Sequence, residues 1–218
     1  LKVFDRWLPD LFIDCHVTDG ADFRYAVTYF IDQSENAVGP VRQWTSHIYL
    51  PYLKQAMQKS GIPISPYVNL VNEKDITKGI ALENNPPRFS TGYVTLRNRP
   101  ALLIESHMLK NYKTRVEGTY QMLLHSLELV ALENQSLHMA VSKGDMETKN
   151  LRGKEFPLNF ASDKKYEMID FQGFNFRTEK SPVSGDQAVV WENIPIDYKI
   201  PYFNSLQPAD SAVVPYAF

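Results

Sequence analysis

The spacing of apolar residues along the chain predicts buried strands. Uninterrupted apolar runs at residues 11–13 and 101–104 each follow a proline-containing segment and are typical of buried strands in a mostly parallel sheet. Residues 25–30 are β-branched and aromatic, which favours another strand, and residues 66–71 are a further strand candidate.

Two longer segments have the 3.6-residue period of amphipathic helices. Between residues 45 and 60, apolar side chains recur at helical spacing until Gly61 and Pro63 end the pattern. Between residues 113 and 132, apolar residues lie along one helix face, and the pattern leaves open a continuation towards Val141. Strands that alternate with helices in this way are typical of the α/β class.

The pattern changes after about residue 150. Short alternating stretches rich in proline and aromatic residues replace the helical period, for example at residues 166–171 and 188–191. We therefore divide the chain into two parts. Residues 1–145 are expected to form an α/β part with a mainly parallel sheet flanked by helices, and residues 146–218 a small β-rich C-terminal extension.

Composition narrows the class of protein. The 218 residues are 44% hydrophobic, 22% charged and 12% aromatic, which excludes disorder as the main state. No apolar run is long enough to span a membrane, and the net charge of −2 gives no general signal for nucleic acid. Cys15 is the only cysteine, which excludes an internal disulfide and a cysteine-based zinc cluster. The chain begins at Leu1 without an initiator Met, and we expect it to be a piece of a longer protein.

Two polar side chains stand at the ends of the clearest strands. His16 follows the first apolar run and Glu105 follows the run at 101–104. Because sites form at the carboxyl ends of strands in open α/β sheets, His16 is a candidate metal ligand and Glu105 a candidate general base. Asp14 shares the strand face of His16 and is a candidate to orient its imidazole. The pattern alone leaves a structural role open for each residue. His16 could be a hydrogen-bonded structural histidine, and Glu105 a carboxylate that stabilises the start of a helix.

Two sequence motifs resemble those of a known enzyme family. Residues 14–22, D-C-H-V-T-D-G-A-D, are similar to the segment that supplies the last zinc-binding histidine of the zinc metallocarboxypeptidases, the carboxypeptidase A-like peptidases. Residues 92–116, with the stretch R-N-R-P-A-L-L-I-E-S-H, are similar to the segment with the catalytic glutamate in a bacterial branch of that family. The motifs occur in the family's order, and the resemblance extends to about residue 140.

The resemblance implies a fold and a set of site residues. The family fold is built around a mixed, mainly parallel sheet, and its cofactor is Zn²⁺. His16 corresponds to a zinc ligand, and Glu105 to the base that activates the zinc-bound water and passes its proton to the leaving amine. The other ligands, an H-x-x-E pair, are expected upstream of Leu1, so the isolated chain is expected to be inactive. Tyr93 is the best candidate for the tyrosine that closes on the substrate.

Other charged residues near the second motif have open roles. Arg97 and Arg99 are candidates to hold a substrate carboxylate through paired hydrogen bonds. The alternative is that both are solvated charges of a loop. His107, two residues after Glu105, is expected to cap a turn or to lie on the surface, and the alternative is that it supports Glu105 from behind the site.

The motifs together predict a zinc-dependent hydrolase that removes C-terminal residues from peptides or peptide-like amides. One alternative is a deacylase of N-acyl amino acids, which shares the chemistry of zinc, histidine and glutamate. Another is a non-catalytic binding domain that has lost its metal site. The resemblance implies a secreted or periplasmic bacterial protein, and no nucleic-acid partner is expected.

Overall fold

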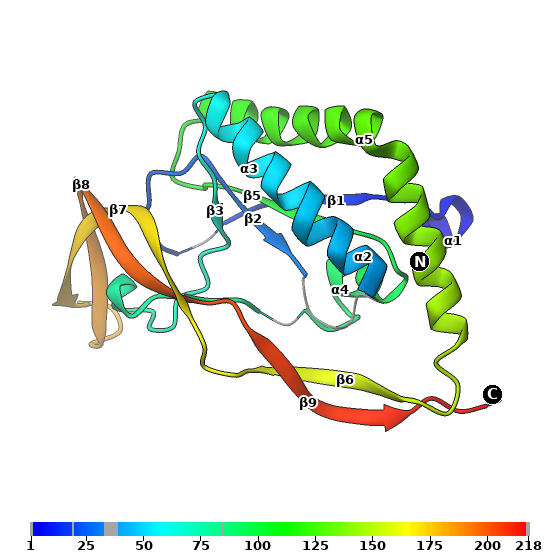
Figure 1. Cartoon of the computed structure of the whole chain (residues 1–218). Helices are drawn as coiled ribbons and strands as arrows, with labels where there is room; N and C mark the ends of the chain where they lie inside the picture. The colour runs from blue at the N-terminus through cyan, green and yellow to red at the C-terminus, as the bar shows by residue number, and fades with distance from the viewer. Residues whose placement is uncertain (1, 19, 33–38, 84, 217–218) are drawn as a thin grey trace.

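A four-stranded mixed sheet lies at the centre of the fold (Figure 1). The computed structural model describes residues 2–18, 20–32, 39–83 and 85–216. The sheet has the order β1-β5-β2-β3, with bounds Phe12–Val17 (β1), Ala101–Ser106 (β5), Val27–Ile31 (β2) and Ser65–Pro66 (β3). β1 is parallel to β5, β2 is antiparallel to β5, and β3 is parallel to β2. The predicted α/β class with a mixed sheet is therefore confirmed.

Helices cover one face of this sheet and enclose an apolar core (Figure 1). They are α2 (Gly39–Trp44), the π-helical turn η1 (Thr45–Tyr49), α3 (Leu50–Lys59) and α5 (Tyr112–Lys149). Val27, Leu102 and Ile104 of the sheet are buried in this core with Leu53 of α3 and Met122 of α5. The helix predicted at 45–60 is thus confirmed, and α2 precedes it.

The long helix α5 includes the predicted range of 113–132 and its continuation towards Val141, and extends eight residues past Val141. It begins after Asn111, whose side-chain oxygen accepts a hydrogen bond from the Thr114 N–H at 2.9 Å. The backbone departs from helical geometry at Glu133 (φ −112°, ψ 21°), and the helix bends (Figure 1). It ends at Lys149, so it crosses the boundary that we placed after residue 145. None of the described helices has both the length and the apolar character that crossing a membrane requires.

Short helices were not predicted. They are α1 (Lys2–Trp7), the 3₁₀ turn η2 (Ile76–Lys78) and α4 (Ser90–Leu96). Each has at most seven residues, which is too short for a helical period to be visible in a sequence. α4 packs against β1 and β5 and so lies close to the candidate site.

The strand predicted at 66–71 is wrong for most of its length. Only Ser65 and Pro66 of this region pair with β2. Pro66 has no N–H to donate to a strand ladder. Farther along, Leu70 forms an isolated bridge with Ile80, and the segment otherwise runs as a loop.

The C-terminal region is β-rich, as predicted. Its strands are β6 (Glu155–Ser162), β7 (Glu167–Lys180), β8 (Gln187–Phe203) and β9 (Leu206–Val213). β7 and β8 form a long antiparallel hairpin, and the short strand β4 (Ile80–Ala81) pairs with β8. β6 and β9 form a separate two-stranded ribbon, which runs below the central sheet in Figure 1.

The β7–β8 hairpin shares a second apolar core with the segment that follows β1. Phe23 and Ile80 are buried in this core together with Phe171 of β7 and Ile200 of β8. Phe23 also forms an isolated antiparallel bridge with Gly173 of β7. Apolar packing and backbone pairing therefore join the hairpin to the α/β part.

Replacing Phe171 by alanine tests this shared core. Removal of a buried ring leaves a cavity, so we expect the free energy of unfolding to fall by about 3–5 kcal/mol. Met168 lies on the same strand but is 53% exposed, and Met168→Ala should cost less than about 1 kcal/mol. Chemical denaturation measures both values. Equal losses for the two variants would contradict a core that joins the hairpin to the α/β part.

Candidate active site

The pairing of β1 with β5 brings His16 and Glu105 side by side. In this parallel ladder His16 is the direct partner of Glu105. Paired residues of neighbouring strands project from the same face, with their backbones about 5 Å apart. The placement at the ends of neighbouring strands is the one that the apolar runs predicted. Since side chains alternate along a strand, this face is opposite to the one with Leu102 and Ile104, which α3 and α5 cover.

Asp14 contacts the imidazole of His16 from the same strand. Its Oδ1 lies 3.1 Å from Nε2 of His16, and its Oδ2 accepts a hydrogen bond from the Ser90 hydroxyl at the start of α4. A carboxylate on one ring nitrogen fixes the ring and directs the other nitrogen, here Nδ1, toward a metal ion. The side chain of His16 is 53% exposed, so the ring is open to solvent. Residue 19, within the motif that follows His16, lies outside the described residues.

Glu105 is far less exposed than His16. It is 6% exposed, and Thr28, its antiparallel partner on β2, is fully buried. Beside it, the Ser106 hydroxyl donates a hydrogen bond to the His16 carbonyl at 3.1 Å, and the Thr18 N–H donates to the Ser106 carbonyl at 2.9 Å. These bonds hold β1 and β5 together to their last residues. The backbone ladder therefore holds His16 and Glu105 on neighbouring positions of the two strands.

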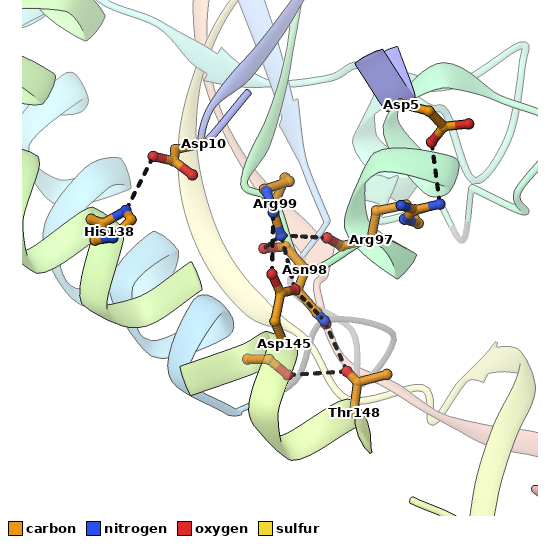
Figure 2. A network of polar contacts seen from close by, with 9 residues as sticks. Asp5, Asp10, Arg97, Asn98, Arg99, His138, Asp145 and Thr148 are labelled. Carbon is orange, nitrogen blue, oxygen red and sulfur yellow. Dashed lines mark hydrogen bonds and ion pairs between the residues drawn. The ribbon is translucent and has the colours of Figure 1, made fainter. Parts of the chain in front are cut away.

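The structure does not bring Tyr93 to this pair. The Tyr93 hydroxyl donates to Asp5 Oδ1 at 3.2 Å, and Arg97 lies 3.4 Å from the same hydroxyl. Arg97 itself forms an ion pair with Asp5 at 3.2 Å (Figure 2). The ring of Phe4 lies between Tyr93 and Phe12, the first residue of β1. Tyr93 and Arg97 thus contact α1 near the start of β1, about 13 Å along the strand from His16.

Arg99 is bound inside the protein (Figure 2). Its guanidinium donates to both carboxylate oxygens of Asp145, at 3.0 and 3.2 Å, and to the Arg97 carbonyl at 2.8 Å. The side chain of Arg99 is 4% exposed and that of Asp145 is 41% exposed. The interpretation of Arg99 as a solvated loop charge is therefore wrong. Its hydrogen bonds attach the start of β5 to the end of α5.

The chain contains one H-x-x-E sequence, which the sequence interpretation overlooked. It is His125-Ser126-Leu127-Glu128 on α5. His125 Nδ1 lies 2.7 Å from Glu128, and its Nε2 lies 2.8 Å from the Ser60 hydroxyl, so both ring nitrogens have partners. Because α5 covers the face of the sheet opposite to His16, this pair does not complete the candidate site.

His107 differs from one of the roles expected from the sequence. It is fully buried, so the expected surface position is wrong. Burial and the charge of Lys110 lower the pKa of His107 to about 4, against the opposing effect of Asp22, and the imidazole is neutral at pH 7. Its Nδ1 accepts a hydrogen bond from the Leu109 N–H at 3.2 Å, so His107 does cap the turn that follows β5.

The donor atoms fit zinc in kind but not in number. Imidazole nitrogen and carboxylate oxygen are common zinc ligands, and His16 with its supporting Asp14 has that chemistry. Among the described residues, no group of three or more His, Cys, Asp or Glu side chains is arranged to hold a metal ion. A catalytic zinc site uses three protein ligands. The site within the described residues is thus part of a zinc site at most.

A cavity of about 540 Å³ lies beside the turn that follows β1. Gly20 and Ala21 of that turn line it, together with Leu70 of the following loop and Trp191 of β8. Its wall is partly apolar and aromatic. The C-terminal hairpin therefore helps to form a cavity next to the segment that leaves His16.

Comparisons with known proteins found no match for this chain. No family model matches the chain, no curated protein matches it, and no solved structure matches it. The resemblance in the two motifs and the geometry of β1 and β5 are therefore the basis for a functional proposal.

The ion pair of Arg99 and Asp145 makes the free energy of unfolding depend on pH. Burial of Asp145 opposes its ionisation, but hydrogen bonds from Arg99 and Asn98 outweigh it and lower the pKa of Asp145 below the ordinary value of 3.8. A carboxyl whose pKa is lower in the folded state stabilises the fold above its unfolded pKa. This stabilisation is lost as the pH falls below about 4 and through the lower folded pKa.

Separate replacement of the two partners should have unequal effects. Asp145→Ala leaves the buried guanidinium of Arg99 without its counter-charge, and we expect a loss of about 1–3 kcal/mol at pH 7, after allowance for the exposure of Asp145. Arg99→Met leaves a carboxylate that water reaches, and should cost about half as much. Urea denaturation at pH 7 and at pH 3 measures the stability loss of each variant. The loss for Asp145→Ala should be smaller at pH 3, where the ion pair contributes less to stability. Equal losses at pH 7 would contradict the asymmetry of burial.

Proposed function

We propose that this chain is the C-terminal part of a zinc-dependent hydrolase that resembles the metallocarboxypeptidases and removes C-terminal residues from peptides. The direct pairing of His16 with Glu105 at the ends of β1 and β5 is the observation that supports this most strongly. A metal ligand and a general base must reach the same water molecule. Direct partners on neighbouring strands meet that requirement.

His16 has the role of a metal ligand in this proposal. Its Nδ1 would hold the zinc ion while Asp14 keeps the ring in one orientation through Nε2. When bound, zinc supplies an acidified water and polarises the scissile carbonyl. The hydrogen bond from Ser90 holds Asp14 in turn, so the ring is supported from both β1 and α4.

Glu105 has the role of the general base. Its carboxylate accepts a proton from the attacking water and then donates that proton to the leaving amine nitrogen. Glu105 is 6% exposed, so the surrounding protein holds its side chain in place and little bulk water reaches it. Tyr93, Arg97 and Arg99 have no part in this mechanism, because their polar atoms bind Asp5 and Asp145.

The remaining zinc ligands are proposed to lie N-terminal to Leu1. One imidazole is too few for a stable catalytic site. In the part of the chain that the structure describes, β1 is the outer strand of the sheet, and Cys15, His16 and Val17 are exposed. Further ligands can therefore approach His16 from this side. The cavity beside Ala21 is the proposed place for a substrate side chain.

Glu105→Gln tests the role of the base. In the full-length protein this variant should keep zinc and lose turnover by about 10²- to 10⁴-fold, because glutamine has nearly the same shape but cannot accept the proton. His16→Ala should instead lower the zinc content. Glu117, exposed on α5, offers the matched control Glu117→Gln, which should change neither value. Metal analysis and peptide hydrolysis are the measurements, and near-normal turnover of Glu105→Gln would rule Glu105 out as the base.

Substrate profiling separates the proposal from its alternatives. Release of C-terminal amino acids from peptides supports the carboxypeptidase. Preference for N-acyl amino acids would instead support a deacylase, which needs the same histidine and glutamate. A full-length protein that binds peptides but neither holds zinc nor cleaves them would be a binding domain.

The isolated 218-residue chain should bind zinc weakly and hydrolyse nothing. Its motif supplies one imidazole, and the nearby carboxylates suit harder ions better. Calorimetric titration with zinc measures the affinity. Submicromolar one-to-one binding would mean that a complete site exists within these residues, and that no upstream ligands are needed.

A further inference from the structure

His107 contacts the segment that leaves β1 after His16. Its ring contacts that of Phe23, with ring centroids 4.1 Å apart and the ring planes tilted by 45°. Its Nε2 lies 3.1 Å from Oδ1 of Asp22 and 3.2 Å from the backbone nitrogen of Phe23. His107 itself belongs to the loop that follows Glu105. The imidazole therefore lies between the two segments that carry the candidate ligand and base.

The other ring nitrogen binds the loop of His107 itself. Nδ1 accepts a hydrogen bond from the Leu109 N–H at 3.2 Å. A neutral imidazole has one proton. When Nε2 carries it, Nδ1 accepts from the Leu109 N–H and Nε2 donates to Asp22; when Nδ1 carries it, Nε2 accepts from the Phe23 N–H and the bond from Leu109 is lost. Each tautomer connects the β1 side to the β5 side, and the link does not depend on which nitrogen carries the proton.

This link lies where the strand ladder has ended. The paired residues of β1 and β5 extend only to Val17 and Ser106. Beyond them, Asp22 is held by His107 and by Lys110, whose Nζ donates to the same oxygen at 3.1 Å. The imidazole is fully buried, so water cannot replace its hydrogen bonds without opening this part of the fold.

We propose that His107 is a positioning residue of the candidate site, which fixes the turn after His16 against the loop after Glu105 and thereby sets how the two side chains approach one another. This inference rests on the proposed function, since it assigns His107 a part in that reaction. The imidazole does not touch the reacting atoms. Its effect passes through Asp22, Phe23 and the backbone, and a displacement of about 1 Å in a catalytic pair can cost about 100-fold in rate.

Two substitutions separate the link from the local turn. Glutamine places its amide near the position of Nε2 and keeps a contact with Asp22 or Phe23, whereas asparagine reaches only the position of Nδ1 and keeps the contact with Leu109. In the zinc-loaded full-length protein, His107→Asn should lower kcat by about 10- to 100-fold with little change in KM or zinc content. His107→Gln should keep kcat within about threefold.

A second measurement is independent of turnover. In the metal-free full-length protein, the amide hydrogen of Phe23 should exchange faster in His107→Asn than in the wild type, and close to the wild-type rate in His107→Gln. The reverse pattern, with fast exchange at Leu109 in His107→Gln and an unchanged Phe23, would show that His107 only holds its own turn. That result would overturn the inference.

Asp22 supplies a second test of the link, and Glu117 supplies the control. Asp22→Ala should lower kcat to a similar extent, and the double variant with His107→Asn should lose little more, because both changes remove one link. Glu117→Gln, at an exposed position of α5 away from this link, should turn over like the wild type. Additive losses in the double variant would contradict a shared link.

The outcomes distinguish this inference from the proposed function. If Glu105→Gln abolishes turnover while His107→Asn leaves kcat and the exchange at Phe23 unchanged, the positioning role is wrong and the function stands. If the full-length protein shows neither zinc binding nor hydrolysis, both proposals fail together.

Discussion

The register of β1 against β5 is the constraint on which the candidate site depends. Ile13, Leu102 and Ile104 pack toward the helices, which places Asp14, His16 and Glu105 on the opposite face. A slip of one residue would move the polar side chains of β1 into the apolar core. The same packing that buries the core therefore sets the pairing of His16 with Glu105.

Buried charged and polar groups near the site attach distant segments to one another. Arg99 joins the start of β5 to the end of α5 through Asp145, and His107 joins the loop after β5 to the segment after β1 through Asp22. A buried guanidinium or imidazole is stable only with a partner that replaces water. These two links hold both ends of β5, the strand that carries Glu105. Arg99, which the sequence offered as a candidate substrate-binding residue, thus helps instead to hold the strand that carries Glu105.

The C-terminal hairpin belongs to this framework as well. Phe171 and Ile200 of the hairpin are buried with Phe23, whose ring also contacts His107. Trp191 of the hairpin lines the cavity beside the turn after β1. The β-rich region therefore packs directly on the segment that leaves His16, and a change in the hairpin can reach the site through Phe23.

The sequence by itself determined the features that depend on local spacing. Apolar runs identified β1 and β5, helical periods identified α3 and α5, and the change of pattern identified the C-terminal strands. The end of each apolar run placed His16 and Glu105 at strand ends, because side-chain alternation and strand termination are local properties. α1 and α4 were too short to show a period.

Only the tertiary structure decided which polar side chains share a site. Arg99 binds a carboxylate 46 residues away, and Tyr93 binds one 88 residues away, so their spacing from Glu105 did not show their partners. The H-x-x-E of α5 has the sequence of a ligand pair but lies on the face opposite to His16. The burial of a side chain and its hydrogen-bond partners depend on contacts between segments that are distant in sequence. Those contacts exist only once the sheet and its helices have packed.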